Sequence, residues 1–172
     1  RGGPLMTDNP NGATMLSEET CKTIDHWVAK FPDDNKRSAL IQSLLAAQEQ
    51  NGGWITEELT EAVASYLGLP PVWAHEVVSF YSMFFTEPVG RHKVNICTNI
   101  SCWLNGGEEL VAHAEKKLGV KLGGTTEDGR ITLVREEECL AGCCGAPMAV
   151  VDGHYKEHLD IEKLDELLDG LE

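Results

Sequence analysis

Two pairs of cysteines constrain this chain more than any other feature. The first pair is Cys97 and Cys102, in the segment C-T-N-I-S-C, and the second is Cys139 and Cys143, in C-L-A-G-C. Each pair is close enough in sequence to bind one metal atom from a short loop, and residues 103–138 leave room for secondary structure between the pairs. Two irons bridged by two sulfides need two thiolates each. The spacing therefore predicts a four-thiolate metal site, in the first place a [2Fe–2S] cluster.

Other uses of these cysteines can be weighed on the same residues. Structural zinc also accepts four thiolates from paired loops, and the spacings here lie at the edge of those that zinc sites use, so zinc stays open. A disulfide framework suits small secreted chains better than one with six cysteines in 172 residues, two of them adjacent. Catalytic thiol exchange favours C-x-x-C, which the sequence lacks, and a bridge between adjacent cysteines is strained. No histidine lies two residues after a cysteine, which disfavours a Rieske centre.

Charge and hydropathy exclude two classes of function. The chain carries 28 acidic and 14 basic side chains, a formal net charge of −14, which would repel a phosphate backbone, so no nucleic-acid binding is expected. No apolar run approaches the roughly 20 residues needed to cross a bilayer. Reduced thiols fit a cytoplasmic setting. A length of 172 residues allows one domain or two small ones.

Residues 17–85 show helical periodicity throughout. Four helices are expected: one capped by Ser17 and ending near residues 33–35, one ending at residues 51–53, one capped by Thr56 and closed by Gly68, and one that starts after Pro70. Together they predict a small helical bundle. The expected apolar faces contain Ile24, Trp27, Val28 and Phe31; Leu40, Ile41, Leu44 and Leu45; Leu59, Val63, Tyr66 and Leu67; and Trp73, Val77, Phe80, Tyr81 and Phe84.

The periodicity changes at residues 87–90. Residues 93–96 alternate polar and apolar as a strand does, residues 107–118 have helical spacing, and residues 131–134 and 148–151 read as strands. Asp152-Gly153 is a hairpin signal, and Asp160 is the expected cap of a last helix. The order strand, helix, strand, strand, helix predicts a compact α/β sandwich of thioredoxin-like order, with both cysteine pairs in loops at strand ends. The whole chain is thus expected to be α+β.

Five short motifs follow one another along the chain. They are S-F-Y-S-M-F at residues 79–84, P-V-G-R at 88–91, C-x4-C at Cys97 and Cys102, T-T-E-D-G-R at 125–130, and C-L-x-x-C-x-x-A-P-M at 139–148. In this order they resemble the 24-kDa-type [2Fe–2S] subunit of NADH:quinone oxidoreductase, which is respiratory complex I. The resemblance extends from about residue 17 to the end of the chain.

The resemblance implies an organisation and a cofactor. It implies a helical bundle at residues 17–88 and a thioredoxin-like ferredoxin domain at residues 89–172. Residues 1–16 are expected to be flexible, and residues 1–5, which precede Met6 and a polar stretch, are expected to be a cloning remnant. The ferredoxin domain would carry one [2Fe–2S] cluster. Carried over position by position, the metal ligands are Cys97, Cys102, Cys139 and Cys143.

The resemblance also implies a role and a partner. The cluster would accept one electron from the FMN of a larger, NADH-binding and NADH-oxidising subunit, and lie beside the main electron route. The sequence has no G-x-G-x-x-G loop, so the chain itself is not expected to bind NADH, and we expect no catalytic residue and no activity alone. The peripheral arm of the complex would hold it at the inner face of a bacterial plasma membrane without direct insertion. The alternative is the equivalent subunit of an NAD(P)-linked hydrogenase or formate dehydrogenase. Part of the aromatic segment 73–85 is expected to contact the partner.

Two departures from the family pattern concern the second cysteine pair. The family usually has C-L-G-x-C, whereas Ala141 occupies the glycine position here, and Cys144 is an additional thiol. The frame C-x-x-A-P favours Cys143 as the ligand, because Ala146 and Pro147 follow it at the matching distance. Cys21 is expected to be an ordinary small hydrophobic residue.

The surroundings of the second pair are expected to tune the cluster. Backbone N–H groups near the sulfurs would favour the reduced state, and the small residues Ala141, Gly142 and Gly145 would let the main chain come close. The three glutamates at residues 136–138 would oppose reduction, so Glu138→Gln is expected to raise the midpoint potential. A solvated rim is the other reading of these glutamates.

Overall fold

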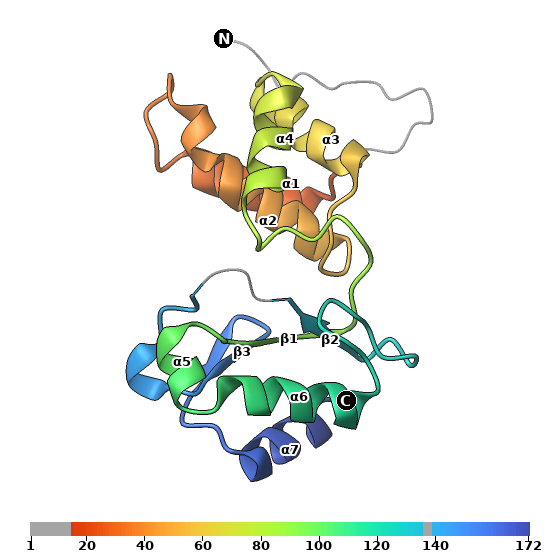
Figure 1. The fold of residues 1–172 in the computed structure, drawn as a ribbon. Coiled ribbons are helices and arrows are strands. Elements are labelled where there is room, and N and C mark those ends of the chain that lie inside the picture. The colour runs from red at the N-terminus through yellow and green to blue at the C-terminus, as the bar shows by residue number, and fades with distance from the viewer. Residues whose placement is uncertain (1–14, 136–138) are drawn as a thin grey trace. The chain divides into compact units, whose positions relative to one another are not determined.

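A computed structural model describes residues 15–135 and 139–172, and the chain divides into two compact units at the junction of Pro88 and Val89 (Figure 1). The first unit is helical, and the second contains a sheet. The remnant predicted at residues 1–5 and all but the last two residues of the segment predicted to be flexible lie outside the described residues.

The helical unit contains the four predicted helices, which are α1 (Glu18–Val28), α2 (Leu40–Gln50), α3 (Glu57–Leu67) and α4 (Pro71–Phe80), and a short 3₁₀ helix, η1 (Lys36–Ala39), precedes α2. The end predicted for the first helix near residues 33–35 is wrong, because α1 already ends at Val28. The predicted caps are confirmed. The hydroxyl of Ser17 accepts the N–H of Thr20 at 3.1 Å, and the hydroxyl of Thr56 accepts the N–H of Leu59 at 3.2 Å. Gly68 ends α3 in the left-handed region.

Most of the predicted apolar faces pack together as the core of this unit, but Trp27, Phe31, Phe80 and Tyr81 are not part of it. Ile24, Leu44 and Val63 are fully buried. Phe80, however, is 75% exposed, so the aromatic run of α4 is not wholly a core stripe. The reason is that the buried face of α4 carries Ala74 and Val78, and at about 100° per residue Phe80 lies on the other side of the helix from Val78. Phe84, in the segment that follows α4, is buried.

The second unit is built on a four-stranded mixed sheet of order β2-β1-β3-β4. Its strands are β1 (His92–Ile96), β2 (Ile131–Val134), β3 (Ala149–Val151) and β4 (His154–Lys156). β1 runs parallel to β2 and antiparallel to β3, and β3 pairs antiparallel with β4. The hairpin predicted at Asp152-Gly153 is confirmed, with φ of 49° and 81° at these residues. β4 is an addition to the predicted order.

Helices α6 (Gly107–Leu118) and α7 (Ile161–Asp169) cover one face of this sheet (Figure 1). The span of α6 agrees with its prediction, and the carboxylate of Asp160 caps α7 by accepting the N–H of Lys163 at 2.8 Å. Two short elements were not predicted, namely α5 (Ile100–Leu104) and the 3₁₀ turn η2 (Cys143–Gly145). The core between sheet and helices contains Val94, Ile96, Leu110, Leu133, Leu164 and Leu168.

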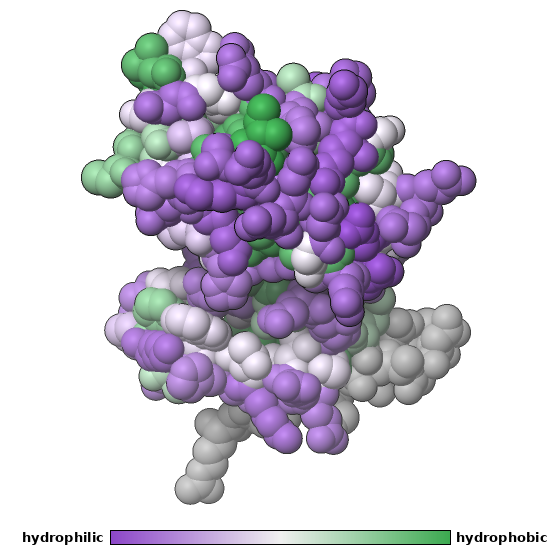
Figure 2. Space-filling model, turned by 90° about the horizontal axis from the view of Figure 1, so that it is seen from below, coloured by the Kyte–Doolittle hydropathy of each residue, from purple (hydrophilic) through white to green (hydrophobic). Residues whose placement is uncertain are grey.

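The surface over α6 and α7 is mainly hydrophilic, with small hydrophobic groups between the polar side chains (Figure 2). Among the described residues, every helix is too short or too polar to cross a membrane.

Candidate metal centre

Four of the six cysteines line one pocket. Cys97, Cys102, Cys139 and Cys143 surround a cavity of about 310 Å³ in the sheet unit. Asn99, Ile100 and Ser101 complete the lining, which includes neither Cys21 nor Cys144. The structure thus brings together the four cysteines that the sequence singled out.

The first pair is held by the end of a strand and a short helix. Cys97 follows β1, and its N–H donates to the carbonyl of Met148 at 3.0 Å, which extends the pairing of β1 with β3. Asn99 starts α5 by accepting the N–H of Ile100 at 2.9 Å. The prediction that both pairs lie in loops is therefore wrong for Cys102, which lies within α5. Both cysteines of this pair are 2% exposed.

Gly107, at the start of α6, supports this pair, and sequence reasoning missed it. A Cβ on Gly107 would lie 2.8 Å from the carbonyl oxygen of Cys97 and 2.9 Å from that of Cys102. Real Cβ atoms do not come so close, so only glycine lets α6 pack against the backbone of both cysteines. The Gly106-Gly107 doublet at a helix start was the available signal.

The second pair is exposed, with Cys139 in an irregular segment and Cys143 at the start of η2. The N–H of Ala141 donates to the sulfur of Cys139 at 3.3 Å, which is a backbone contact of the kind expected. Ala141 has a φ of 61°, in the left-handed region that favours glycine, which explains why the family has glycine there. The hydroxyl of Tyr155 donates to the carbonyl of Leu140 at 2.8 Å and ties this segment to β4.

Gly142 and Gly145 allow close contacts, but with side chains rather than with the sulfurs. A Cβ on Gly142 would overlap the sulfur of Met148, and one on Gly145 would overlap the side chain of Glu157. Met148 is 1% exposed and packs with Cys97 and Cys102 in a small apolar cluster. Gly142 therefore lets the second segment pack on Met148, and Gly145 lets it pack on Glu157.

The thiols influence one another within pairs and between pairs. Burial raises the pKa of Cys102 to about 11, and the neighbouring thiol of Cys97 adds to the rise. The Ala141 N–H lowers the pKa of Cys139, but burial and the thiol of Cys143 outweigh it, so that this pKa is also raised. Charge on Cys143 further raises the pKa of Cys102, and charge on Cys97 that of Cys139. Metal binding at these thiols would displace their protons.

The remaining predicted residues lie elsewhere. Cys21 is half-buried and packs against the core of the helical unit, where burial raises the pKa of its thiol. Cys144 is exposed on η2, next to Cys143. The glutamates at residues 136–138 lie outside the described residues, so their effect on the potential stays a prediction.

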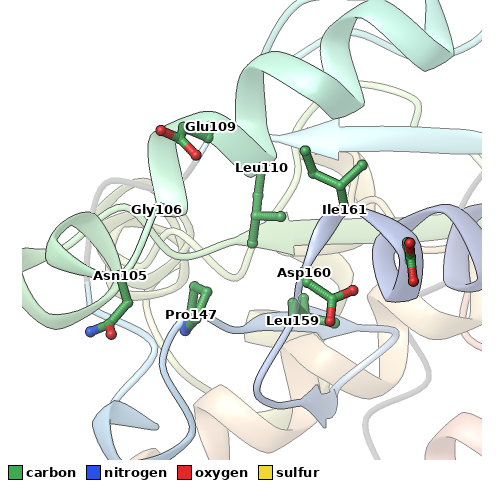
Figure 3. A pocket seen from close by; sticks show the side chains of 9 residues that line it. Asn105, Gly106, Glu109, Leu110, Pro147, Leu159, Asp160 and Ile161 are labelled. Carbon is green, nitrogen blue, oxygen red and sulfur yellow. The ribbon is translucent and has the colours of Figure 1, made fainter.

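A larger pocket of about 510 Å³ lies beside the starts of α6 and α7 (Figure 3). Leu110, Pro147 and Leu159 contribute apolar surface, and Glu109 and Asp160 contribute carboxylates. Asp160 already caps α7. The pocket contains no cysteine, so it is separate from the thiol site.

Comparison with known proteins places the chain among iron–sulfur proteins. Residues 24–172 match the profile of the thioredoxin-like [2Fe-2S] ferredoxin family. A subunit of the NADH-quinone oxidoreductase of Rickettsia felis is 44% identical over 142 residues, which are 83% of this chain and 84% of that protein. The mitochondrial NADH dehydrogenase [ubiquinone] flavoprotein 2 of Dictyostelium discoideum is 38% identical over 169 residues, 97% of this chain and 68% of that protein.

A solved structure also resembles the chain. The NAD+-reducing [NiFe]-hydrogenase, in its air-oxidized state, contains a chain that matches 74% of this one with a TM-score of 0.62 and 25% identity. The match spans only 22% of that hydrogenase chain.

Proposed function

Because the chain belongs to the thioredoxin-like [2Fe–2S] ferredoxin family and matches the 24-kDa-type subunits of NADH-quinone oxidoreductases over most of its length, we infer that it is the electron-transfer subunit of a complex I. The predicted family, fold class and cofactor are confirmed, and the cofactor is one [2Fe–2S] cluster rather than zinc. The observation that carries the proposal is the gathering of four cysteines from two separate motifs around one pocket.

The cluster ligands in this proposal are Cys97, Cys102, Cys139 and Cys143. Their position around one pocket, two from each motif, supports it, because each iron needs two thiolates. When bound, the cluster supplies a one-electron carrier. The position of Cys144 outside the pocket lining supports Cys143 as the fourth ligand.

The protein's own residues give the site two different sides. Cys97 and Cys102 are buried on Met148, which shields their sulfurs from water. Cys139 and Cys143 are exposed, so an electron would enter from this side. The Ala141 N–H pointing at the Cys139 sulfur partly offsets thiolate charge and favours the reduced state.

The proposed electron donor is the FMN-bearing, NADH-oxidising subunit of the complex. The names of the relatives support this partner, since they describe parts of NADH dehydrogenases. In a bacterial cell the chain would lie on the cytoplasmic side of the plasma membrane, attached through the complex. A second candidate is the equivalent position in an NAD(P)-linked hydrogenase, which the structural match to an NAD+-reducing [NiFe]-hydrogenase favours.

Co-expression tests the proposed partner. The chain is produced together with the flavin-bearing complex I subunit of its own organism or with the flavin-bearing chain of an NAD+-reducing hydrogenase. Size-exclusion chromatography with light scattering should give a stable one-to-one complex, with flavin and cluster absorbance in one peak, only for the first. A complex with the hydrogenase chain alone would select the second candidate, and a monomer in both mixtures would contradict the electron-transfer proposal.

A further inference from the structure

Three side chains with metal-binding groups lie together in the helical unit, outside the thiol site. They are Glu57 and Glu61 of α3 and His75 of α4. One carboxylate oxygen of each glutamate and a ring nitrogen of the histidine all lie within 4.8 Å of one another. Glu57 and Glu61 are four residues apart, so they share one face of α3. We call these three residues the α3–α4 site.

The backbone under the α3–α4 site is fixed by a short turn and a shared core. Gly68 ends α3 with a φ of 69°, and α4 already begins at Pro71. Within the turn, the N–H of Leu69 donates to the carbonyl of Ala64 at 2.9 Å. Ala64 on α3 and Ala74 on α4 are both fully buried in the core of this unit. The three side chains therefore extend from two packed helices rather than from a loop.

The spacing within the site suits a shared ion better than a direct hydrogen bond. The Nε2 atom of His75 lies 3.7 Å from a carboxylate oxygen of Glu61, which is too far for a hydrogen bond. Two ligand atoms about 2.1 Å from one tetrahedral Zn²⁺ are about 3.4 Å apart, so a small side-chain movement would let both bind the same ion. Glu57 is exposed, and its side chain is free to close the remaining distance.

The surrounding sequence supplies negative charge without basic side chains. Residues 38–90 contain no lysine or arginine but six glutamates, namely Glu49, Glu57, Glu58, Glu61, Glu76 and Glu87. Like charges four residues apart on a helix repel each other, and among the described residues neither glutamate of the site pairs with a lysine or arginine. A bound cation would relieve this repulsion.

A basic residue just before this range is used elsewhere. The guanidinium of Arg37 lies over the ring of Trp73, 4.3 Å from its centre. Trp73 precedes His75 by two residues, which places the two side chains about 200° apart around α4. Arg37 is therefore held on a different side of α4 from the α3–α4 site.

We propose that Glu57, Glu61 and His75 bind one divalent transition-metal ion, with Zn²⁺ as the representative ion and water completing the coordination. An imidazole nitrogen with two carboxylates is a ligand set that zinc accepts, whereas Mg²⁺ and Ca²⁺ prefer sites built from oxygen. The ion would join α3 to α4 and stabilise the helical unit by mass action. The proposal concerns a second site and does not depend on the electron-transfer function inferred above.

Isothermal titration with ZnCl₂ tests the site. The full-length protein with its cluster is used, with Cys21→Ser and Cys144→Ser introduced to remove the two thiols outside the pocket lining. It should bind about one Zn²⁺ per chain. His75→Gln and Glu61→Gln should each weaken the affinity by about tenfold or more, because each variant removes one of three protein ligands.

Glu58→Gln is the matched control. It removes the same charge as Glu61→Gln from the same helix, but Glu58 is not part of the α3–α4 site. The affinity of this variant should therefore stay within about twofold of the unchanged site, since only long-range, screened attraction is lost. Excess Mg²⁺ should not displace Zn²⁺. Zn²⁺ should also raise the thermal unfolding temperature of the protein with the unchanged site, but not that of His75→Gln.

Three outcomes would overturn the proposal. The first is an absence of Zn²⁺ binding, or an unchanged affinity in His75→Gln. The second is a loss in Glu58→Gln as large as in Glu61→Gln, which would reduce the binding to attraction by an acidic surface. The third is an electron paramagnetic resonance (EPR) spectrum of the dithionite-reduced protein that changes on addition of Zn²⁺, which would assign the zinc to the thiol site. The EPR spectrum is expected to stay the same.

Discussion

The two units use the same residue type in opposite ways. In the helical unit Cys21 is half-buried among apolar side chains and acts as one of them. In the sheet unit four cysteines converge from a strand end, a short helix and an irregular segment onto one pocket. The helices of the first unit are fixed by caps and apolar faces, whereas the thiol site depends on close backbone contacts around glycine. Packing thus stabilises the helices in the first unit, and in the second unit it positions the four thiols.

The largest effect expected from this difference between the cysteines of the two units is the loss of the cluster. Serine at Cys97, Cys102, Cys139 or Cys143 should abolish or greatly alter the iron–sulfur spectrum, since an alcohol is a poor replacement for a thiolate ligand. Iron content and visible absorbance measure it. Cys21→Ser and Cys144→Ser are the controls and should keep the cluster. A cluster that survives in Cys143→Ser but not in Cys144→Ser would transfer the fourth position to Cys144.

The next largest effect is that of core truncation, which should affect the cluster differently in the two units. Leu44→Ala and Leu133→Ala each remove a fully buried side chain and should cost about 2–5 kcal/mol of unfolding free energy. Leu133 lies on β2, which pairs with the strand leading to Cys97, so this variant alone should release the cluster at lower urea concentration. Urea titrations followed by circular dichroism and cluster absorbance test this. Cluster release at an equally low urea concentration in Leu44→Ala would contradict the predicted difference between the two units.

Gly107→Ala should be costly for a steric reason. The added methyl group would press on the carbonyls of Cys97 and Cys102, so the unfolding free energy should fall by about 1–3 kcal/mol and the cluster should become less stable. Gly52→Ala is the matched control, because its Cβ would meet no atom within 4 Å and would add only left-handed strain. The crowding argument fails if cluster retention is the same in the two variants.

Replacing an alanine by glycine should change the unfolding free energy in opposite directions in the two units. Ala141→Gly relieves left-handed strain and should raise the unfolding free energy by about 0.5–1 kcal/mol. Ala62→Gly within α3 should lower it by about 1 kcal/mol, as glycine does inside a helix. Thermal or urea unfolding gives both values, and a decrease in both variants would remove the explanation for Ala141.

The smallest effect depends on pH. Asp152 accepts a hydrogen bond from His92 at 2.7 Å and raises the pKa of His92 above its ordinary value. The stabilisation is therefore complete below the unfolded-state pKa of about 6.5 and is lost as pH rises through the higher folded-state pKa. His92→Gln should cost more at about pH 5.5 than at about pH 9, when unfolding free energies are compared. A loss of unfolding free energy in His92→Gln that grows toward high pH would contradict this prediction. His26→Gln, in the helical unit, is the control.

The sequence predicted the regular elements well and the details of the site less well. Side-chain caps at Ser17, Thr56 and Asp160 and the Asp152-Gly153 turn act locally, so their residues reveal them directly. The four thiols could be chosen by spacing and resemblance. α5 escaped because one helical turn has no measurable period, and its apolar face points to solvent rather than to a core.

The role of Gly107 and the exposure of Phe80 could not be foreseen for a different reason. Both depend on how segments distant in sequence pack against one another. The contact that requires Gly107 involves carbonyls of other elements. Phe80 is exposed because α4 packs through the face that carries Ala74 and Val78, and the aromatic repeat in the sequence does not show which face is buried.

EPR of the anaerobically purified, dithionite-reduced protein, together with iron, sulfide and zinc analysis, tests the central claim most directly. We predict a rhombic signal of a one-electron-reduced [2Fe–2S] centre with about two irons per chain. An EPR-silent, iron-free protein with about one zinc per chain would contradict the electron-transfer function.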